Sequence, residues 1–202
     1  MGLDVIKKYF YPTKVLDIGA NVGQFYHECS KIFPESYYFL IEGNGKCEEA
    51  LKNLKVDYKI SMLSDINKQV DFYVRKHEPL CTGNSIYREN TTFFNDDQIL
   101  IQKISTEKLD DLFTNEKFDL IKIDVQGSEL DIMKGGINLI TKSKGVILEI
   151  SLVEYNFNSP KKEEVYNFME SLGFYPVELI GNITHPIDHS LIQQDILFLK
   201  QS

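Results

Sequence analysis

The sequence predicts an α/β fold, a three-layer αβα sandwich around a mostly parallel seven-stranded sheet whose last strand is antiparallel. Short apolar runs of strand length alternate with longer stretches of helix length, which is the pattern of repeated βα units. The last two predicted strands follow one another without a helix. Because a parallel return needs a crossover of about a dozen residues or more, the final strand is expected to be antiparallel.

Two βα units and a third strand are predicted in the first half of the chain. The apolar runs of strand length lie over residues 14–18, 37–41 and 56–61. The stretches of helix length lie over residues 22–33 and 46–54. Pro34 is expected to end the first helix because proline cannot continue it. The alternation in VDFYVRK predicts a half-exposed strand over residues 70–76.

The segment 77–105 is predicted to be an irregular insert that binds substrate or acts as a lid, because it has turn-forming residues and little periodicity. Regular alternation returns after this insert. Strands are predicted over residues 118–124, 145–151, 173–180 and 194–200. Helices are predicted over residues 128–141, with a break at Gly135 and Gly136, and over residues 160–172.

Composition narrows the class of protein. With 202 residues and 43% hydrophobic content the chain can bury one core, so residues 1–202 are predicted to form one domain. The net charge is −8, and no basic run gathers with aromatic residues, so nucleic acid is not an expected partner. No window has the roughly 18 to 20 apolar residues of a membrane span. The three cysteines share no metal-ligand spacing and are expected to be reduced thiols.

The first candidate site is KVLDIGANVGQF, residues 14–25, where a buried strand ends in an acid and then turns. Gly19 and Gly23 would let the backbone approach a ligand, and the helix that follows offers free N–H groups. Asp17 would repel the pyrophosphate of a dinucleotide, and the glycine spacing differs from G-x-G-x-x-G. An acid here suits an amine-bearing ligand such as the amino acid end of S-adenosylmethionine. A tight turn with a capping Asp is the alternative interpretation.

Two further acidic motifs follow predicted strands. Glu42 lies about 19 residues after Gly23, where a carboxylate can accept hydrogen bonds from ribose hydroxyls, although Asn44 nearby could simply cap the next helix. In DLIKIDVQGSELDIMKGG, residues 119–136, alternation places Lys122 and Asp124 on one strand face. A buried lysine needs a partner, which Asp124 or Glu149 could supply. An internal ion pair and an active-site acid cluster both remain open.

Taken in order, these motifs resemble the FkbM-type methyltransferases, which are S-adenosylmethionine-dependent enzymes of the class I Rossmann-like fold. The matching segments run from about Lys14 to Lys200 and are VLDIGANVGQF, FLIEGN, MLSD, NSIY, KIDVQGSELDIMKGG, LEIS and DILFL. The pattern KIDVQG-x-EL with an LKGG-like ending is the most specific of them. Met133 stands where the family often has Leu.

The resemblance implies S-adenosyl-L-methionine as the cofactor and gives the candidate residues their roles. The first motif would surround the methionine part, Glu42 would hold the ribose, and the segment after the third strand would flank adenine. The full cofactor set is Asp17, Gly19, Ala20, Asn21, Gly23, Glu42, Gly43, Asn44, Leu63, Ser64 and Asp65. Asp124 is the first candidate for a catalytic base, Glu149 the second, and Lys122 the group that orients them. No metal ligands are predicted, although clustered carboxylates could hold Mg²⁺.

The resemblance also implies O-methylation of a hydroxyl on a sugar, a glycan precursor or a natural product, with a small-molecule or glycan acceptor. A cytoplasmic location is expected because the cofactor is there. Two alternatives belong to other classes of protein. One is a methyltransferase-like module that binds the cofactor and serves as a partner-binding part of a biosynthetic assembly. The other is a nicotinamide oxidoreductase, which the glycine spacing disfavours.

Overall fold

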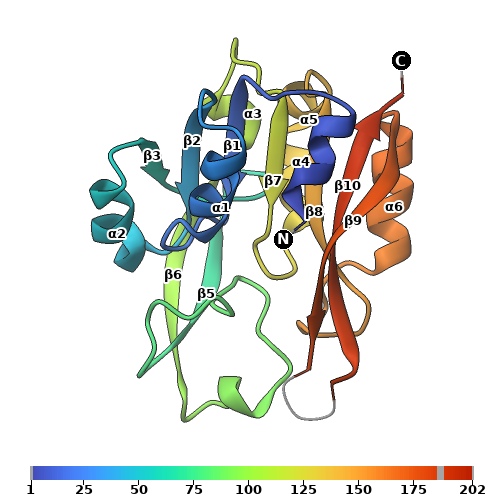
Figure 1. Ribbon diagram of the computed structural model, residues 1–202. Helices are drawn as coiled ribbons and strands as arrows, with labels where there is room; N and C mark the ends of the chain where they lie inside the picture. Colours follow the sequence, from blue (N-terminus) through green and yellow to red (C-terminus); the bar gives the residue numbers. More distant parts are fainter. Residues whose placement is uncertain (1, 186–188, 202) are drawn as a thin grey trace.

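A seven-stranded sheet forms the middle layer of the computed structural model, which describes residues 2–185 and 189–201 (Figure 1). Its strands are β1 (Lys14–Ile18), β2 (Tyr37–Glu42), β3 (Asp57–Ile60), β7 (Leu120–Ile123), β8 (Gly145–Ser151), β9 (Phe174–Thr184) and β10 (Leu191–Lys200). Their order in the sheet is β3-β2-β1-β7-β8-β10-β9. The pairs that join β3, β2, β1, β7 and β8 are parallel, whereas β10 is antiparallel to both of its neighbours. The predicted fold class is therefore confirmed.

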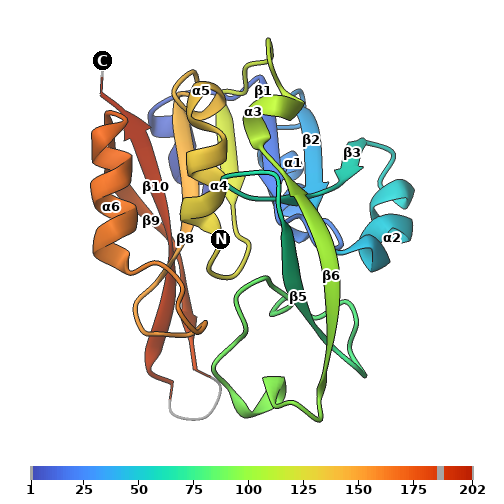
Figure 2. The ribbon, with the colours of Figure 1, turned by 180° about the vertical axis from the view of Figure 1, so that it is seen from behind.

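Helices cover both faces of the sheet (Figures 1 and 2). The elements on one face are the 3-10 helices η1 (Leu3–Lys8) and η2 (Gly45–Cys47) and the helices α1 (Gln24–Ile32) and α2 (Glu48–Asn53). Those on the other face are α3 (Leu109–Leu112), α4 (Glu129–Gly135), α5 (Ile137–Ile140) and α6 (Lys162–Ser171). Each face has its own hydrophobic core cluster, and β1 contributes Val15 to one cluster and Leu16 to the other. The alternation of side chains along a strand explains this division.

The predicted break in the helix over 128–141 is present, and α4 ends where α5 begins, at Gly135 and Gly136. The break brings the backbone of Gly135 against the backbone of Ser64, since a Cβ atom at Gly135 would collide with the carbonyl oxygen of Ser64. Only glycine allows this approach. The close contact joins α4 to the chain that follows β3, and so fixes α4 beside the carboxyl-terminal edge of the sheet.

The prediction of an irregular insert over 77–105 is wrong for its last residues. The nine-residue strand β6 (Ile99–Glu107) begins there and pairs antiparallel with β5 (Gln69–Arg75) and parallel with β4 (Met62–Leu63). Most of β6 is exposed, including the neighbouring Leu100 and Ile101, so its sequence lacks the alternation that marks a half-buried strand. The irregular part is shorter and is called the insert below, residues 77–98, with the 3-10 helix η3 (Thr92–Phe94).

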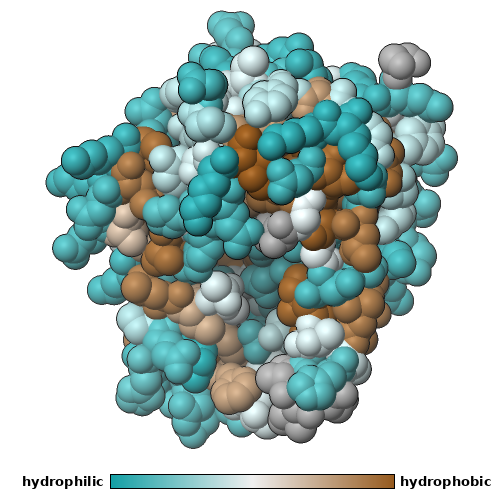
Figure 3. Space-filling model, in the orientation of Figure 1, coloured by the Kyte–Doolittle hydropathy of each residue, from teal (hydrophilic) through white to brown (hydrophobic). Residues whose placement is uncertain are grey.

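The carboxyl-terminal edge of the parallel strands lies between two extensions of the structure. In Figure 1, β5, β6 and the insert extend beyond this edge on one side, and β9 and β10 extend beyond it on the other. The space-filling view in Figure 3 shows a hollow between them with hydrophilic residues at its centre and hydrophobic residues on both sides. β1 and β7 are adjacent although they are far apart in sequence, which is the switch point where open α/β sheets bind ligands.

Candidate active site

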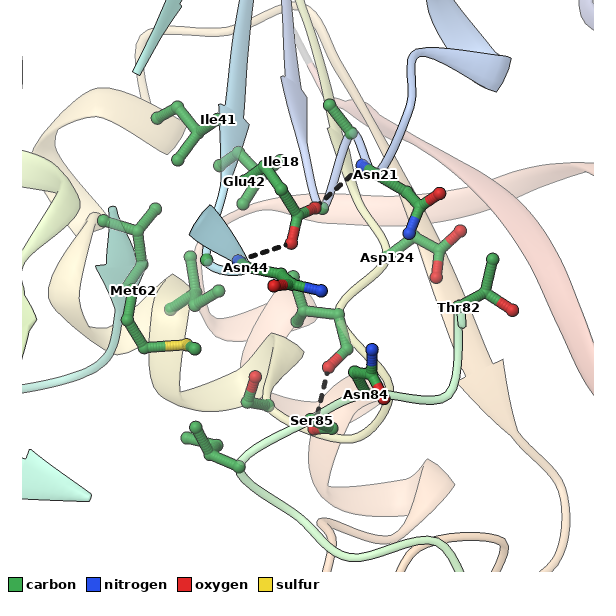
Figure 4. A pocket seen from close by; sticks show the side chains of 18 of the residues that line it. Ile18, Asn21, Ile41, Glu42, Asn44, Met62, Thr82, Asn84, Ser85 and Asp124 are labelled. Atoms are coloured by element: carbon green, nitrogen blue, oxygen red, sulfur yellow. Dashed lines mark hydrogen bonds between the residues drawn. The ribbon is translucent and has the colours of Figure 1, made fainter. Parts of the chain in front are cut away.

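A cavity of about 260 Å³ opens at the carboxyl ends of β1, β2 and β7 (Figure 4). Its walls come from the loops after these strands, from the start of α1 and from the insert. The lining residues are Ile18, Gly19, Ala20, Asn21, Gln24, Phe25, Ile41, Glu42, Gly43, Asn44, Ser61, Met62, Leu63, Phe72, Cys81, Thr82, Asn84, Ser85, Ile86, Lys122, Asp124, Val125, Ser128 and Ile132. Lys122 is the single cationic side chain in this lining.

The turn after β1 is held tightly against the neighbouring strands. The amides of Gly19 and Ala20 both donate to the carbonyl oxygen of Ile41, at 2.9 and 3.0 Å. Gly19 has φ of +81°, and a Cβ atom there would collide with the carbonyl oxygen of Asp124. Glycine is therefore needed at this position both for its backbone conformation and for the close approach of the chain at the end of β7. The turn brings the ends of β1, β2 and β7 together at one place.

Glu42 joins the loops that follow β1 and β2 (Figure 4). Its Oε2 accepts from the amide of Asn21 at 2.7 Å, and its Oε1 accepts from the amide of Asn44 at 2.8 Å. Burial raises the pKa of Glu42, and the two backbone N–H donors partly oppose that rise. Each carboxylate oxygen keeps a further lone pair, so Glu42 can accept hydrogen bonds from a ligand while it orders both loops.

Lys122 lies between two carboxylates on the α1 face of the sheet. Asp17 and Lys122 are register partners across β1 and β7, and Lys122 Nζ lies 2.9 Å from Asp124 Oδ2 and 3.9 Å from Asp17 Oδ1. The Asp17 side chain is fully buried, whereas that of Asp124 is 24% exposed. Burial raises the pKa of Asp17 to about 6, with Lys122 opposing. Burial alone would lower the pKa of Lys122, but Asp124 and Asp17 outweigh it and raise that pKa.

A chain of side-chain hydrogen bonds leads from Asp124 away from the cavity. Gln126 Nε2 donates to Asp124 Oδ1 at 3.3 Å and to Glu149 Oε2 at 2.6 Å, and Gln193 Nε2 donates to the same Glu149 oxygen at 2.8 Å. Burial raises the pKa of Glu149 well above its ordinary value, and the charge of Asp124 adds to the rise. Asp195, the register partner of Glu149 on β10, is also buried, and burial raises its pKa to about 6.

The loop after β7 is fixed from two sides. Ser85 Oγ, in the insert, lies 3.1 and 2.8 Å from the carbonyl oxygens of Val125 and Gln126, which share its single hydroxyl proton. From α4, Glu129 Oε1 accepts from the amides of Val125 and Gly127, both at 3.1 Å. These bonds hold a backbone in which Gln126 and Gly127 both have positive φ. Asp124 is thus presented by a loop with little freedom.

Replacement of Glu129 by Gln is expected to remove a pH dependence of stability. Burial raises the pKa of Glu129 from 4.5 to about 7. A raised pKa in the folded state gives stability that is fully present below about pH 4.5 and is lost as pH rises through about 7. The loss amounts to roughly 3 kcal/mol at about 1.4 kcal/mol per pKa unit. Urea unfolding of the wild type and of Glu129→Gln between these pH values measures the free energy of unfolding. If that free energy fell with pH equally steeply in both proteins, the raised pKa of Glu129 would be contradicted.

The insert is hydrogen-bonded to the loops after β1 and β2. Asn21 Nδ2 donates to the carbonyl oxygen of Leu80 at 3.1 Å, and Asn44 Nδ2 donates to that of Pro79 at 2.6 Å. The lining residues that the insert supplies are Cys81, Thr82, Asn84, Ser85 and Ile86. The two asparagines therefore connect the predicted cofactor loops to the predicted lid.

Most of the predicted site residues meet at this cavity. Those in the lining are Gly19, Ala20, Asn21, Glu42, Gly43, Asn44, Leu63, Lys122 and Asp124. Those outside it are Asp17, Gly23, Ser64, Asp65 and Glu149. Asp17 is buried behind Lys122, and Gly23 is the residue before α1. Asp65 Oδ1 accepts from Lys68 Nζ at 2.8 Å and from Ser64 Oγ at 3.0 Å, so the Ser64 and Asp65 side chains bond to each other and Asp65 also pairs with Lys68.

Several lining residues were not predicted from the sequence. Gln24 and Phe25 belong to α1 directly after the glycine turn, and Ser61 and Met62 immediately precede the predicted Leu63, so proximity to the motifs could have indicated them. Asp195, which is buried beside Glu149 outside the lining, could have been noticed as an acid at the start of the apolar run DILFL. The insert was predicted as a segment, but its individual lining residues were not, because they and Phe72 reach the cavity only through tertiary folding.

The chemistry of the lining fits S-adenosylmethionine. Neither carboxylate oxygen of Asp17 has a hydrogen-bond partner among the described residues, and Lys122 is its cationic neighbour at 3.9 Å. Asp17, Glu42 and Asp124 thus face a single ammonium group. A surplus of carboxylates suits a ligand that carries positive charge. Glu42 has lone pairs for ribose hydroxyls, and Ile18, Ile41 and Leu63 give the cavity an apolar part.

Within residues 2–185 and 189–201, no group of three or more His, Cys, Asp or Glu side chains is arranged to hold a metal ion. Over the same residues, none of the helices combines the length and the apolar character that crossing a membrane requires.

Comparison with known proteins gives a family match and several structural neighbours. The family model described as the methyltransferase FkbM domain matches residues 17–176. Magnesium protoporphyrin IX methyltransferase from Synechocystis, solved with bound SAM, is 10% identical, with a TM-score of 0.58 over 98% of this chain and 75% of that one. A precorrin-6y C5,15-methyltransferase from Geobacter metallireducens is 14% identical, with a TM-score of 0.55 over 98% and 85%.

A TehB-like SAM-dependent methyltransferase from Corynebacterium glutamicum is 10% identical, with a TM-score of 0.54 over 99% of this chain and 86% of that one. At such identities the likeness concerns the fold alone. No curated protein matches the sequence of this chain. The family match covers the loops after β1, β2, β7 and β8, which carry the predicted site.

Proposed function

The chain belongs to the FkbM methyltransferase domain family and has S-adenosylmethionine as its cofactor, and we propose that it methylates a hydroxyl group of a sugar, a glycan precursor or a natural product. The observation that carries this proposal is Asp124, a carboxylate that lines the cavity and is held by Lys122 at 2.9 Å. A hydroxyl must lose a proton as it is methylated, and Asp124 is placed to accept it.

We assign cofactor binding to the loops after β1 and β2. Glu42 would accept hydrogen bonds from the ribose hydroxyls, and the acidic surroundings of Asp17 would favour the amino acid end of the cofactor. Gly19 and Asn21 would shape the wall next to it, and Leu63 would lie along the adenine. When bound, the cofactor supplies a methyl group already activated by the sulfonium, so the protein has mainly to position the acceptor and remove its proton.

The catalytic base in this proposal is Asp124. Lys122 Nζ donates to Oδ2 of Asp124, and the Gln126 side-chain amide donates to Oδ1. Each oxygen retains a lone pair for the acceptor hydroxyl. Glu149 is outside the cavity lining, and its Oε2 accepts a hydrogen bond from Gln126 Nε2 at 2.6 Å. We therefore assign Glu149 a positioning role, in which it holds Gln126 against Asp124.

The electrostatics of the cavity support an acceptor without a negative charge beside the reacting oxygen. Carboxylates outnumber the single ammonium of Lys122, and an acceptor with a phosphate or carboxylate beside the reacting oxygen would be repelled by Asp124. Sugars and other polyols are uncharged and present hydroxyl groups. We also propose the cytoplasm, where the cofactor is, as the place of the reaction.

A methyl-transfer screen tests the proposed function. The purified protein is incubated with S-adenosylmethionine and hydroxylated acceptors, including nucleotide sugars, and product masses are read. We expect one acceptor to gain a single methyl group, with fragmentation placing it on oxygen. Binding of S-adenosylhomocysteine is measured in parallel. Methylation on nitrogen or carbon would contradict the proposal. Tight cofactor binding with no product from any acceptor would favour a cofactor-binding module of a biosynthetic assembly.

A further inference from the structure

A second concave site lies at the opposite end of the sheet from the cofactor cavity. It is formed by the segment before β7, the turn before β8, the carboxyl end of β10 and the chain after η1. Five lysines line it, and we call it the lysine groove: Lys8, Lys117, Lys142, Lys144 and Lys200. The chain as a whole carries a net charge of −8 with 22 Lys and Arg residues, so this gathering runs against its overall charge.

The lysine groove keeps an excess of positive charge after its ion pairs are counted. Lys144 Nζ lies 3.0 Å from Asp119 Oδ1, and Lys8 Nζ lies 3.1 Å from Glu178 Oε1. Lys200 Nζ donates to the backbone carbonyl of Thr141. Lys117 and Lys142 form no ion pair with any residue that the structure describes. These two ammonium groups are therefore available to an anionic partner.

The backbone of the groove argues against a compact phosphate as that partner. Phosphate sites use backbone N–H groups that point at the ligand. Here the amides of Lys144 and Gly145 both donate to the carbonyl oxygen of Asp119, and the amides of Lys142 and Ser143 donate to the carbonyl oxygens of the preceding helix. The four amides of this turn therefore point away from a ligand, and the lysine side chains are the main donors, which suits anionic groups spread along a chain.

The shape and the aromatic residues of the groove indicate a polypeptide. Lys144 lies over the ring of Phe10, with Nζ 5.8 Å from the ring centroid, and Leu199 packs beside Phe10. Tyr9 is 43% exposed. A planar bilayer surface does not enter a concave groove, whereas an extended segment can place an apolar side chain on the aromatic residues and carboxylates on the lysines.

We propose that the lysine groove binds an acidic segment of a partner protein, with its carboxylates on Lys117 and Lys142 and an apolar side chain on Tyr9 and Phe10. Charge complementarity of this kind sets the specificity and the rate of association. The inference does not depend on the proposed methyl acceptor. Because the groove and the cofactor cavity lie at opposite ends of the parallel strands, a docked partner leaves the cavity open (Figure 1).

Fluorescence anisotropy with a labelled peptide tests the proposal. The probe is a peptide of about twelve residues with alternating Glu and two Leu, titrated with the full chain. The variant Lys117→Glu/Lys142→Glu breaks no ion pair among the described residues, so it is expected to fold. Its control is Lys31→Glu/Lys134→Glu, which changes two exposed lysines on α1 and α4 and alters the net charge equally.

We expect the groove variant to weaken peptide binding at least about tenfold and the control variant less than about twofold, with binding reduced between low and physiological salt. Equal losses of peptide affinity in both variants would mean that net charge alone explains binding, and this would overturn the proposal. Absence of peptide binding to the wild type at low salt would overturn it too. The same titrations use inorganic phosphate, vesicles with anionic lipids and a short RNA. If phosphate, the vesicles or the RNA bound through Lys117 and Lys142 and the peptide did not, the proposal of an acidic protein segment would be wrong.

Discussion

Replacement of Asp124 by Asn is expected to lower the rate of methyl transfer by about 10²–10⁴-fold, the usual contribution of a general base. Asn keeps the shape of the side chain but cannot take the proton of the acceptor hydroxyl. The loops that hold the cofactor are joined through Glu42, so the affinity for S-adenosylhomocysteine should stay within about threefold. The measurements are kcat with the acceptor that the screen identifies and calorimetry of S-adenosylhomocysteine.

The matched variant for this prediction is Glu149→Gln, which changes the other candidate base. The amide oxygen of the introduced side chain would still accept from Gln126 and Gln193, so a positioning residue should tolerate the change with a loss of no more than about tenfold. A large loss in Glu149→Gln with a small loss in Asp124→Asn would reverse the two roles. Equal large losses would show that the buried pair acts as one unit.

Replacement of Gly19 by Ala is expected to destabilise the fold by about 4 kcal/mol or more, which lowers the melting temperature by roughly 10 °C. Two effects combine there, because φ is +81° and the added Cβ atom would collide with the backbone of Asp124. Backbone atoms cannot move aside as the end of a side chain can. The junction of β1 and β7 would open.

Gly173→Ala separates the two effects. Gly173 has φ of +80°, and a Cβ atom there would meet nothing within 4 Å. Gly173→Ala is therefore expected to destabilise the fold only through the strained backbone conformation, by about 1–2 kcal/mol. Thermal unfolding of both variants gives the difference. Equal melting temperatures would mean that the close approach of Gly19 to Asp124 is not part of the native structure.

The sequence was informative where local pattern and burial agree. β1 and β8 begin and end at the predicted residues because each is a short apolar run bounded by residues that suit turns. The sequence could predict that Asp17, Glu42 and Asp124 lie close together, because parallel strands end at one edge of the sheet. The antiparallel β10 followed from the absence of a crossover helix.

What the sequence did not reveal depends on contacts between distant segments. β6 was missed because both of its faces are largely exposed, so its residues show no alternation. Glu149 ends a strand as predicted, but the side chain of Gln126 lies between it and Asp124, and a side-chain conformation leaves no mark in a pattern. The bond from Ser85 to the loop of Asp124 joins residues about forty positions apart.

Calorimetry of S-adenosylhomocysteine against the wild type measures whether the cavity binds this cofactor, with NAD as the competing ligand and Glu42→Ala to locate the site. We expect one-to-one binding of S-adenosylhomocysteine and no binding of NAD. In Glu42→Ala we expect the affinity to fall at least about a hundredfold, because two hydrogen bonds to a charged group contribute about 1.5–3 kcal/mol each. Tighter binding of NAD, or unchanged affinity for S-adenosylhomocysteine in Glu42→Ala, would contradict the assignment of this cavity to the cofactor.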